Sequence, residues 1–281
     1  MSKISAFFVR IAPQHAISNL MHRMTRIRAP WYKNPQIKWF INKYKVDMSI
    51  AAEPDPTAYK DFNSFFTRSL RAGTRPLDKN EDLIISPVDG RISQFGEIKG
   101  QTLIQAKNHN FNLTSLLSGS EALARHFQDG EFCTIYLAPH DYHRIHMPVA
   151  GTLREMTYVP GALFSVNAHT ADTVPDLFAR NERVITIFDT ERGPVAMILV
   201  GAINVGSMET SWHGCVTPPY GKGVTSWRYD KQEINFKRGD EMGRFNMGST
   251  VVMLFANKKI KWNSNIKHDQ VIEMGRALSS E

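Results

Sequence analysis

Cysteine is scarce in this chain of 281 residues, which contains only Cys133 and Cys215. Neither lies in a Cys-x-x-Cys motif, and two cysteines cannot build the disulfide framework of a small secreted protein. We therefore expect both thiols to be reduced, as in a protein that faces the cytosol. Long apolar runs are also missing: the longest, 195–203, is far shorter than the roughly 18 residues that a membrane-spanning helix needs.

Acidic residues are absent from positions 1–46, which hold nine Lys and Arg residues. The rest of the chain carries 25 basic and 27 acidic residues, so the formal net charge of +7 comes from this N-terminal arm. The first residues also lack the clear hydrophobic core and cleavage site of a secretory signal. Because 42% of the residues are hydrophobic, the chain can bury the core of one large domain, and a disordered protein is excluded.

Apolar residues of the arm recur at helical spacing, which predicts two short amphipathic helices separated by Pro30 and Pro35. The two stripes are Ile17, Leu20, Met21, Met24 and Ile27, and Ile37, Phe40, Ile41 and Tyr44. A basic arm of this kind with aromatic residues suits the interface of an anionic bilayer. A core helix with a solvated basic face explains the composition equally well. Nucleic acid is a weaker alternative, because no recognised binding motif accompanies the basic residues.

From about residue 84, the sequence consists of short β-type runs separated by Gly and Pro. We predict strands over 132–138, 183–189, 195–205 and 250–256, and helices over 63–70 and 113–127. The fold class is therefore α+β, with a mainly antiparallel β catalytic body, 47–281, and an N-terminal amphipathic helical arm, 1–46.

Four segments carry residues suited to chemistry, although each is weak alone. They are 86–90 (SPVDG), 139–148 (PHDYHRIHMP), 205–210 (VGSMET) and 247–250 (MGST). Asp-Gly is common in hairpin turns, and Gly-Ser-Thr is common where a turn enters a strand. The second segment spaces His140, His143 and His146 three residues apart, with Asp141 between the first two. Such histidines can serve as acid–base groups or as zinc ligands.

In order and spacing, the four segments resemble the bacterial phosphatidylserine decarboxylase family of proenzymes. Further similarity lies in 63–68, 163–167 and 177–183, so the resemblance covers roughly residues 60–260. The family's cleavage motif usually begins with Leu, whereas this one begins with Met247. Both side chains are apolar and unbranched at Cβ, so we still expect cleavage.

The resemblance implies autocatalytic cleavage between Gly248 and Ser249 by a triad of Asp89, His146 and Ser249. In this scheme His146 takes the proton of the Ser249 hydroxyl, while Asp89 fixes the tautomer of His146. The Ser249 Oγ attacks the Gly248 carbonyl carbon, and glycine favours this because it has no Cβ to obstruct the approach. Elimination of the resulting ester and hydrolysis then release ammonia and convert Ser249 into a pyruvoyl cofactor. The products are a β-chain, 1–248, and an α-chain, 249–281.

The implied activity is decarboxylation of phosphatidylserine to phosphatidylethanolamine, with the pyruvoyl carbonyl as the electron sink. His143 is the candidate acid that protonates the former α-carbon, and Asp141 and Tyr136 are supporting groups. No metal and no nucleic acid are expected. Because the substrate is a membrane lipid, we expect the processed pair of chains to lie peripherally on the anionic cytoplasmic face of the inner membrane, and to dimerise further.

Two other interpretations leave part of the pattern unexplained. A zinc hydrolase that uses His140, His143 and His146 predicts stoichiometric metal and an uncleaved chain. A non-catalytic protein that binds membrane or nucleic acid through its arm gives no role to Asp89, the histidines or Gly248–Ser249.

Overall fold

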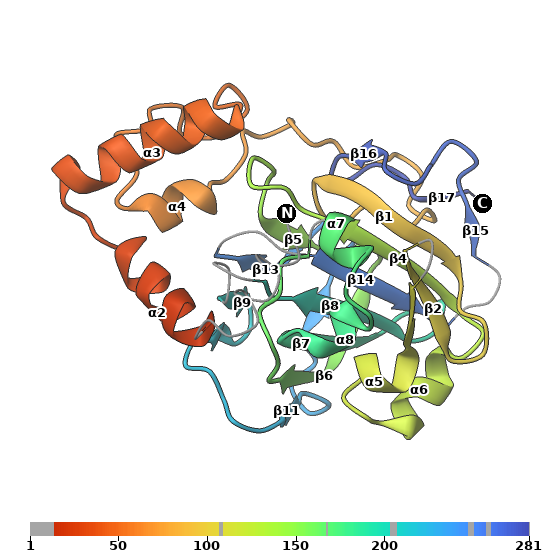
Figure 1. Ribbon diagram of the computed structural model, residues 1–281. Helices are drawn as coiled ribbons and strands as arrows, with labels where there is room; N and C mark the ends of the chain where they lie inside the picture. Colours follow the sequence, from red (N-terminus) through yellow and green to blue (C-terminus); the bar gives the residue numbers. More distant parts are fainter. Residues whose placement is uncertain are drawn as a thin grey trace.

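The computed structural model describes residues 14–106, 109–166, 168–202, 207–246, 250–256 and 260–280. Within them the largest element is a nine-stranded antiparallel sheet of order β11-β6-β7-β8-β14-β4-β1-β16, with β12 also paired to β6 (Figure 1). Its strands are β1 Gly90–Glu97, β4 Glu131–Tyr136, β6 Gly151–Val159, β7 Arg183–Asp189, β8 Val195–Val200, β11 Thr225–Arg228, β12 Asn235–Phe236, β14 Thr250–Phe255 and β16 Val271–Ile272.

A second, four-stranded sheet of order β10-β9-β13-β5 lies beside the large one. Its strands are β5 Arg144–His146, β9 Met208–Thr210, β10 Gly214–Thr217 and β13 Glu241–Phe245. Two strand pairs complete the β structure: β2 Thr102–Ala106 with β3 His109–Asn112, and β15 Lys261–Trp262 with β17 Ser279–Ser280. The mainly antiparallel α+β class predicted from the sequence is confirmed.

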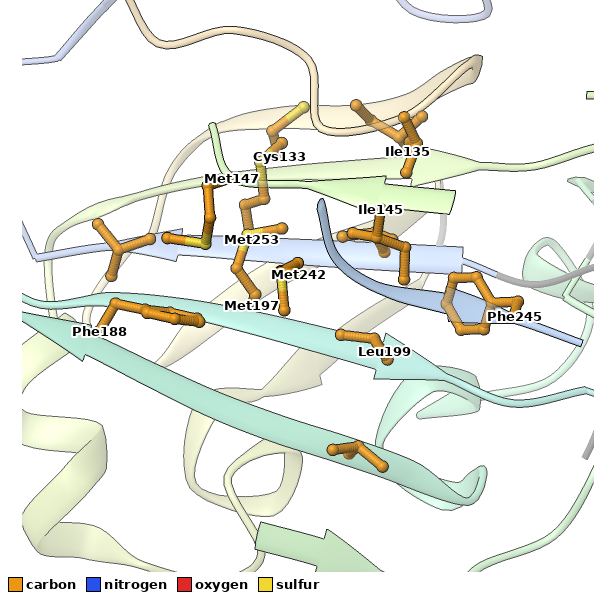
Figure 2. Packing of buried hydrophobic residues seen from close by; sticks show 14 of the residues in the cluster. Cys133, Ile135, Ile145, Met147, Phe188, Met197, Leu199, Met242, Phe245 and Met253 are labelled. Atoms are coloured by element: carbon orange, nitrogen blue, oxygen red, sulfur yellow. The ribbon is translucent and has the colours of Figure 1, made fainter. Parts of the chain in front are cut away.

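The two faces of the large sheet bury separate cores, because successive side chains of a strand point to opposite sides. Along β14, Val251 and Met253 belong to one core, and Val252 and Leu254 to the other. Figure 2 shows the first core, which fills the space between the two sheets. Its members include Ile145, Met147, Met242 and Phe245 from the small-sheet side and Cys133, Ile135, Met197, Leu199 and Met253 from the large sheet.

The second core lies beneath short helices that cover the other face of the large sheet. These helices are α5 Leu113–Leu116, α6 Glu121–Phe127, α7 Ala168–Ala171 and α8 Leu177–Arg180. The prediction of a single helix over 113–127 is wrong, because a turn separates α5 from α6. Ser118 and Gly119 have φ values of 58° and 85°, and Ser120 then caps α6 through the amide of Leu123. Left-handed residues of this kind end a helix.

The arm consists of α2 Gln14–Met24 and α3 Pro30–Tyr44, with α4 Phe62–Phe66 next to α3 (Figure 1). The prediction that Pro30 and Pro35 separate the helices is wrong for Pro35, which lies inside α3. Pro30 begins α3, where its missing amide hydrogen is no loss. Pro35 removes one hydrogen bond, and packing of the following residues Ile37 and Phe40 against α4 holds the helix together.

The predicted strand 183–189 coincides with β7, while β4 and β14 end before their predicted last residues. The run predicted over 195–205 forms β8 only to Val200, and 203–205 fall outside the described residues. The helix predicted over 63–70 ends at Phe66. Across the described part of the chain, every helix is too short or too polar to cross a bilayer.

Candidate active site

The predicted cleavage site, Gly248–Ser249, lies outside the described residues, but the chain is well ordered by hydrogen bonds just before it. In β13, the amide of Phe245 donates to the carbonyl of His143 (3.0 Å). Next to it, Asn246 donates from its amide and from Nδ2 to the carbonyl and hydroxyl of Ser207, both at 2.9 Å. The cleavage segment therefore leaves the small sheet from a point beside His143.

Just after the predicted cleavage site, the chain enters the middle of the large sheet. Thr250, the first residue of β14, pairs with Tyr136 of β4 and Val200 of β8. Thr250 is fully buried, and its hydroxyl has no hydrogen-bond partner among the described residues. The three residues 247–249 thus connect the small sheet to a central strand of the large sheet.

The other three motif segments meet around strand β13, directly before residues 247–249. Strand β5, within 139–148, and strand β9, within 205–210, flank β13 on its two sides. Segment 86–90 runs beside β5, where the amide of His146 donates to the carbonyl of Pro87 (2.8 Å). The fold therefore brings together segments that are more than 100 residues apart in the sequence.

His143 is buried and has one free nitrogen. Its Nδ1 donates to the carbonyl of Asp141 (2.8 Å), which leaves a lone pair on Nε2. That Nε2 is buried without a partner among the described residues. Its ring packs at 4.1 Å on Phe66. Burial, reinforced by the charge of Arg68, lowers the pKa of His143 to about 3, so the imidazole is neutral near pH 7.

His146 has both ring nitrogens occupied. Its Nδ1 donates to the carbonyl of Gly239 (2.7 Å), so the hydroxyl of Tyr142 donates to Nε2 (3.0 Å). Burial lowers the pKa of His146, while the hydrogen bond to the Gly239 carbonyl and, more weakly, the charges of Glu241 and Asp89 oppose this shift. The side chain is thus a neutral base whose tautomer is fixed by a backbone carbonyl.

Asp89 is bound by Arg75 rather than by His146. Arg75 donates to both carboxylate oxygens, with Nη2 at 2.6 Å and Nε at 2.8 Å, and the amide of Met274 adds a bond of 2.8 Å. The hydrogen bond expected between Asp89 and His146 is not among the contacts of the described residues. Gly90, which follows, has no room for a side chain, because a Cβ would lie 2.5 Å from the carbonyl oxygen of Tyr136.

The two supporting residues hold the strand ends in different ways. Asp141 accepts a bond from the amide of Ala138 (2.6 Å) and so shapes the turn that presents His143. Burial raises the pKa of Asp141. Tyr136 packs against the second core, on the same face as Thr250, and lines a cavity of about 280 Å³ together with Gln105 and Val166. Burial, and then the charge of Asp141, raises the pKa of Tyr136.

The histidine triplet does not provide a set of zinc ligands. Nδ1 of His143 and both nitrogens of His146 are engaged by protein groups, and the side chain of His140 is 52% exposed. Nowhere in the described ranges do three or more His, Cys, Asp or Glu side chains gather as metal ligands would. The two cysteines, Cys133 and Cys215, are free thiols.

Two charged residues near this site received no role from the sequence. The backbone carbonyl of Glu182 accepts a hydrogen bond from the amide of Gly201 (2.8 Å). The side-chain Oε2 of Glu182 is buried without a partner among the described residues. Arg68, directly after α4, is 2% exposed and keeps two guanidinium nitrogens unbonded among the described residues. Both lie in segments of family similarity, 63–68 and 177–183, which was the only signal that could have singled them out.

The chain is similar to known proteins over its whole length. A sequence model described as phosphatidylserine decarboxylase matches residues 62–280, and one described as PSD matches residues 4–45. A protein of Marinobacter nauticus is 52% identical over 280 residues, 99% of this chain and 98% of that protein. Relatives from Shewanella baltica (51% over 284 residues, 100% and 97%) and Methylococcus capsulatus (50% over 278 residues, 99% and 96%) are similar. All three carry the name phosphatidylserine decarboxylase proenzyme.

Proposed function

The chain belongs to the phosphatidylserine decarboxylase family, and we propose that it converts phosphatidylserine to phosphatidylethanolamine and carbon dioxide with a pyruvoyl group made from Ser249. The observation that carries the proposal is the convergence of segments 86–90, 139–148 and 207–210 around strand β13, which leads directly into 247–249. A zinc site gives no reason for this convergence, whereas self-cleavage requires it.

The groups around the chain ends fit an uncharged, buried cofactor. The Nε2 of His143 and the hydroxyl of Thr250 are buried without partners among the described residues, and His143 is neutral. Such a setting suits a pyruvoyl group, which has carbonyl acceptors and no formal charge. When present, this group supplies the electron sink for loss of carbon dioxide.

In self-cleavage, His146 is the proposed base, because its Nε2 carries the lone pair. The Tyr142 hydroxyl bound to that nitrogen must give way to the Ser249 hydroxyl or relay its proton. The Gly239 carbonyl keeps the tautomer, and the negative charges of Glu241 and, more weakly, Asp89 favour the imidazolium. In this proposal Asp89 acts through the electrostatic field, without the direct bond of a hydrolase triad.

In turnover, His143 is the proposed proton carrier. Its Nε2 carries a lone pair with no partner among the described residues, so it can take up a proton from the substrate and return a proton to the former α-carbon. The carbonyl and carboxylate of Asp141 hold the turn that aims this nitrogen. Tyr136 supports the same region from the opposite face of the sheet.

After cleavage, strands of the α-chain, 249–281, would remain paired with strands of the β-chain. Strand β14 pairs on both sides with β-chain strands, β4 and β8, and β16 pairs with β1. These ladders would hold the two chains together without a peptide bond. Further dimerisation of this unit stays an expectation.

The arm supports a peripheral place on the anionic cytoplasmic face of the inner membrane. Large apolar side chains remain exposed there: Leu20 at 58%, Trp31 at 78% and Trp39 at 55%. Together with the exposed cations Arg23, Arg28, Lys38, Lys43 and Lys45, they match an interfacial surface.

Denaturing intact-mass spectrometry tests the proposal. The wild-type protein should give two chains split at 248/249, and the N-terminus of the shorter should be blocked and react with carbonyl reagents. Ser249→Ala should give one chain and release no carbon dioxide from phosphatidylserine, whereas the exposed-site control Ser211→Ala should behave as wild type. A free amine on Ser249 would rule out the pyruvoyl group, because ordinary proteolysis leaves one.

A further inference from the structure

Arg68 is a buried cation without an anionic partner in the described structure. It is 2% exposed, and only one of its nitrogens, Nη2, has a bond, to the carbonyl of His140 (3.0 Å). Nε and Nη1 are buried and unbonded, and no described carboxylate forms an ion pair with the guanidinium. Since a buried unpaired charge is costly, its persistence indicates an anionic ligand.

A cavity of about 250 Å³ lies against Arg68. Its walls contain four cationic side chains, Lys60, Arg68, Arg144 and Arg244, against one carboxylate, Glu53. Arg144 and Arg244 are already neutralised by Glu241 and Glu209. Arg68 and Lys60 therefore give the cavity its surplus of positive charge, and its polar remainder includes Asn63, Ser64 and Thr67.

The cavity adjoins the candidate catalytic histidine. Arg144, which lines it, directly follows His143 and donates from Nε to the carbonyl of Thr67 (2.9 Å). Phe66 packs on the His143 ring, and the charge of Arg68 contributes to the lowered pKa of that ring. Other walls come from the segment between α3 and α4, which begins at the proposed membrane-facing arm.

We propose that Arg68 and this cavity bind the phosphodiester of the phospholipid headgroup, an inference that rests on the proposed function. Phosphatidylserine offers two anions, and the reaction itself distinguishes them. An arginine paired with the carboxylate would stabilise the substrate relative to the transition state, in which that carboxylate loses its charge as carbon dioxide. The phosphodiester keeps its charge throughout, so binding it orients the headgroup without opposing the chemistry. The two unbonded nitrogens, Nε and Nη1, can each donate a charge-assisted hydrogen bond to a phosphate oxygen.

Short-chain lipids dispersed in detergent separate the two anions. In Arg68→Gln, KM for phosphatidylserine should rise about 10- to 100-fold with a smaller change in kcat, and inhibition by phosphatidylethanolamine should weaken by the same factor. Phosphatidylethanolamine has the phosphodiester but no carboxylate. Unchanged inhibition by it, whether or not KM rises, therefore overturns the proposal. The control Arg71→Gln removes an exposed arginine three residues away and should match wild type.

A second measurement does not depend on self-cleavage. Calorimetry of short-chain phosphatidylethanolamine binding to the uncleaved Ser249→Ala protein, with and without Arg68→Gln, should give a Kd about 10- to 100-fold weaker in the double variant. Equal affinities would overturn the proposal. If the wild-type protein cleaves but releases no carbon dioxide from phosphatidylserine, the proposed function fails instead, independently of Arg68.

Discussion

Two histidines three residues apart, His143 and His146, differ in their hydrogen bonding. His146 has both nitrogens bonded, whereas His143 keeps a free, buried Nε2. Both imidazoles are neutral, so each can act as a base. Each can act as a general acid only after its Nε2 has accepted a proton. The free Nε2 of His143 is consistent with its proposed role in turnover, whereas the proposed role of His146 in cleavage comes from the family resemblance and requires the Tyr142 hydroxyl to move or to relay a proton.

We expect the two alanine variants to separate these roles. His146→Ala should accumulate uncleaved precursor, and so should Asp89→Asn. His143→Ala should cleave and form the carbonyl-reactive N-terminus, yet release carbon dioxide at least roughly 100-fold more slowly. For each variant, a denaturing gel measures cleavage and a carbon dioxide release assay measures turnover, and the two results together test the proposed roles. A cleaved and fully active His146→Ala, or an uncleaved His143→Ala, would show that the roles are reversed or shared.

Glu182 shows at the same scale how burial sets the pH dependence of stability. Burial raises its pKa to about 7 from 4.5, against the opposing hydroxyl bonds from Tyr158 and Thr217. Between those two values the folded protein keeps a proton that the unfolded chain has lost. The free energy of unfolding should therefore fall as pH rises from 4.5 to 7, by about 3 kcal/mol, and then level off.

Glu182→Gln keeps the shape of the side chain and cannot ionise, so it should remove this part of the pH dependence. The measurement is urea unfolding between pH 4.5 and 8 in the uncleaved Ser249→Ala background, where one chain unfolds. The exposed-site control Glu191→Gln should keep the wild-type slope. Parallel curves for Glu182→Gln and its parent would show that Glu182 is ionised in the folded protein at pH 7.

At the scale of elements, the arm is attached to the body through α3 and α4. Phe40 lies 5.2 Å from Phe62 and 5.9 Å from Phe66 between ring centroids, and Phe66 in turn packs on His143. A buried cluster therefore crosses the boundary at residue 46 that the charge distribution suggested; its members are Ile37, Phe40, Val46, Phe62, Phe65 and Phe66. Arm and catalytic body are mechanically connected by aromatic packing.

Neighbouring residues of α3 provide a matched test of this attachment. Phe40→Ala should lower the free energy of unfolding by on the order of 3 kcal/mol and increase hydrogen exchange in α3 and α4, because it leaves a cavity among packed rings. Trp39→Ala, at a side chain 55% exposed, should change both little. Equal effects of the two substitutions would show that α3 does not depend on this cluster.

For the whole molecule, the excess of basic residues and the exposed tryptophans lie on one side. The helices α2 and α3 lie on one side of the molecule, and the β15–β17 pair near the C-terminus lies on the other (Figure 1). Exposed tryptophans and the acid-free stretch both belong to the arm side. Because α3 also packs on α4, removing residues 1–46 would expose Phe62 and Phe66. Substitution of the exposed tryptophans is therefore a cleaner test of membrane binding than truncation.

The double variant Trp31→Ala/Trp39→Ala should lower co-sedimentation with phosphatidylglycerol-containing vesicles by about tenfold, since it removes apolar area that the interface would bury. Self-cleavage should be unchanged. Val271→Ala, at an exposed apolar residue of β16, is the control and should bind as wild type. High salt should weaken binding of all three proteins. Undiminished sedimentation of the tryptophan variant would assign the arm a structural role only.

Patterns that depend on neighbours in the chain could be predicted from the sequence alone. The β7 run, RVITIFD, is a continuous apolar strand because it is buried on both faces, and its bounds were predicted at 183–189. The family, too, followed from the order of four short segments, since chemistry constrains residue type and spacing locally. The one-sided charge of the arm was visible in the same way.

Contacts between distant segments were decided by the tertiary structure alone. Nothing near Asp89 in the sequence indicates that Arg75 binds it, nor that a carbonyl at Gly239 holds His146. Helical spacing placed Phe40 in an apolar stripe, but it did not predict that α4 would cover that residue. The sequence around Arg68 gave no indication that this side chain would be buried. Burial depends on which elements meet, and burial is what makes Arg68 an unpaired charge and Glu182 an acid with a pKa near 7.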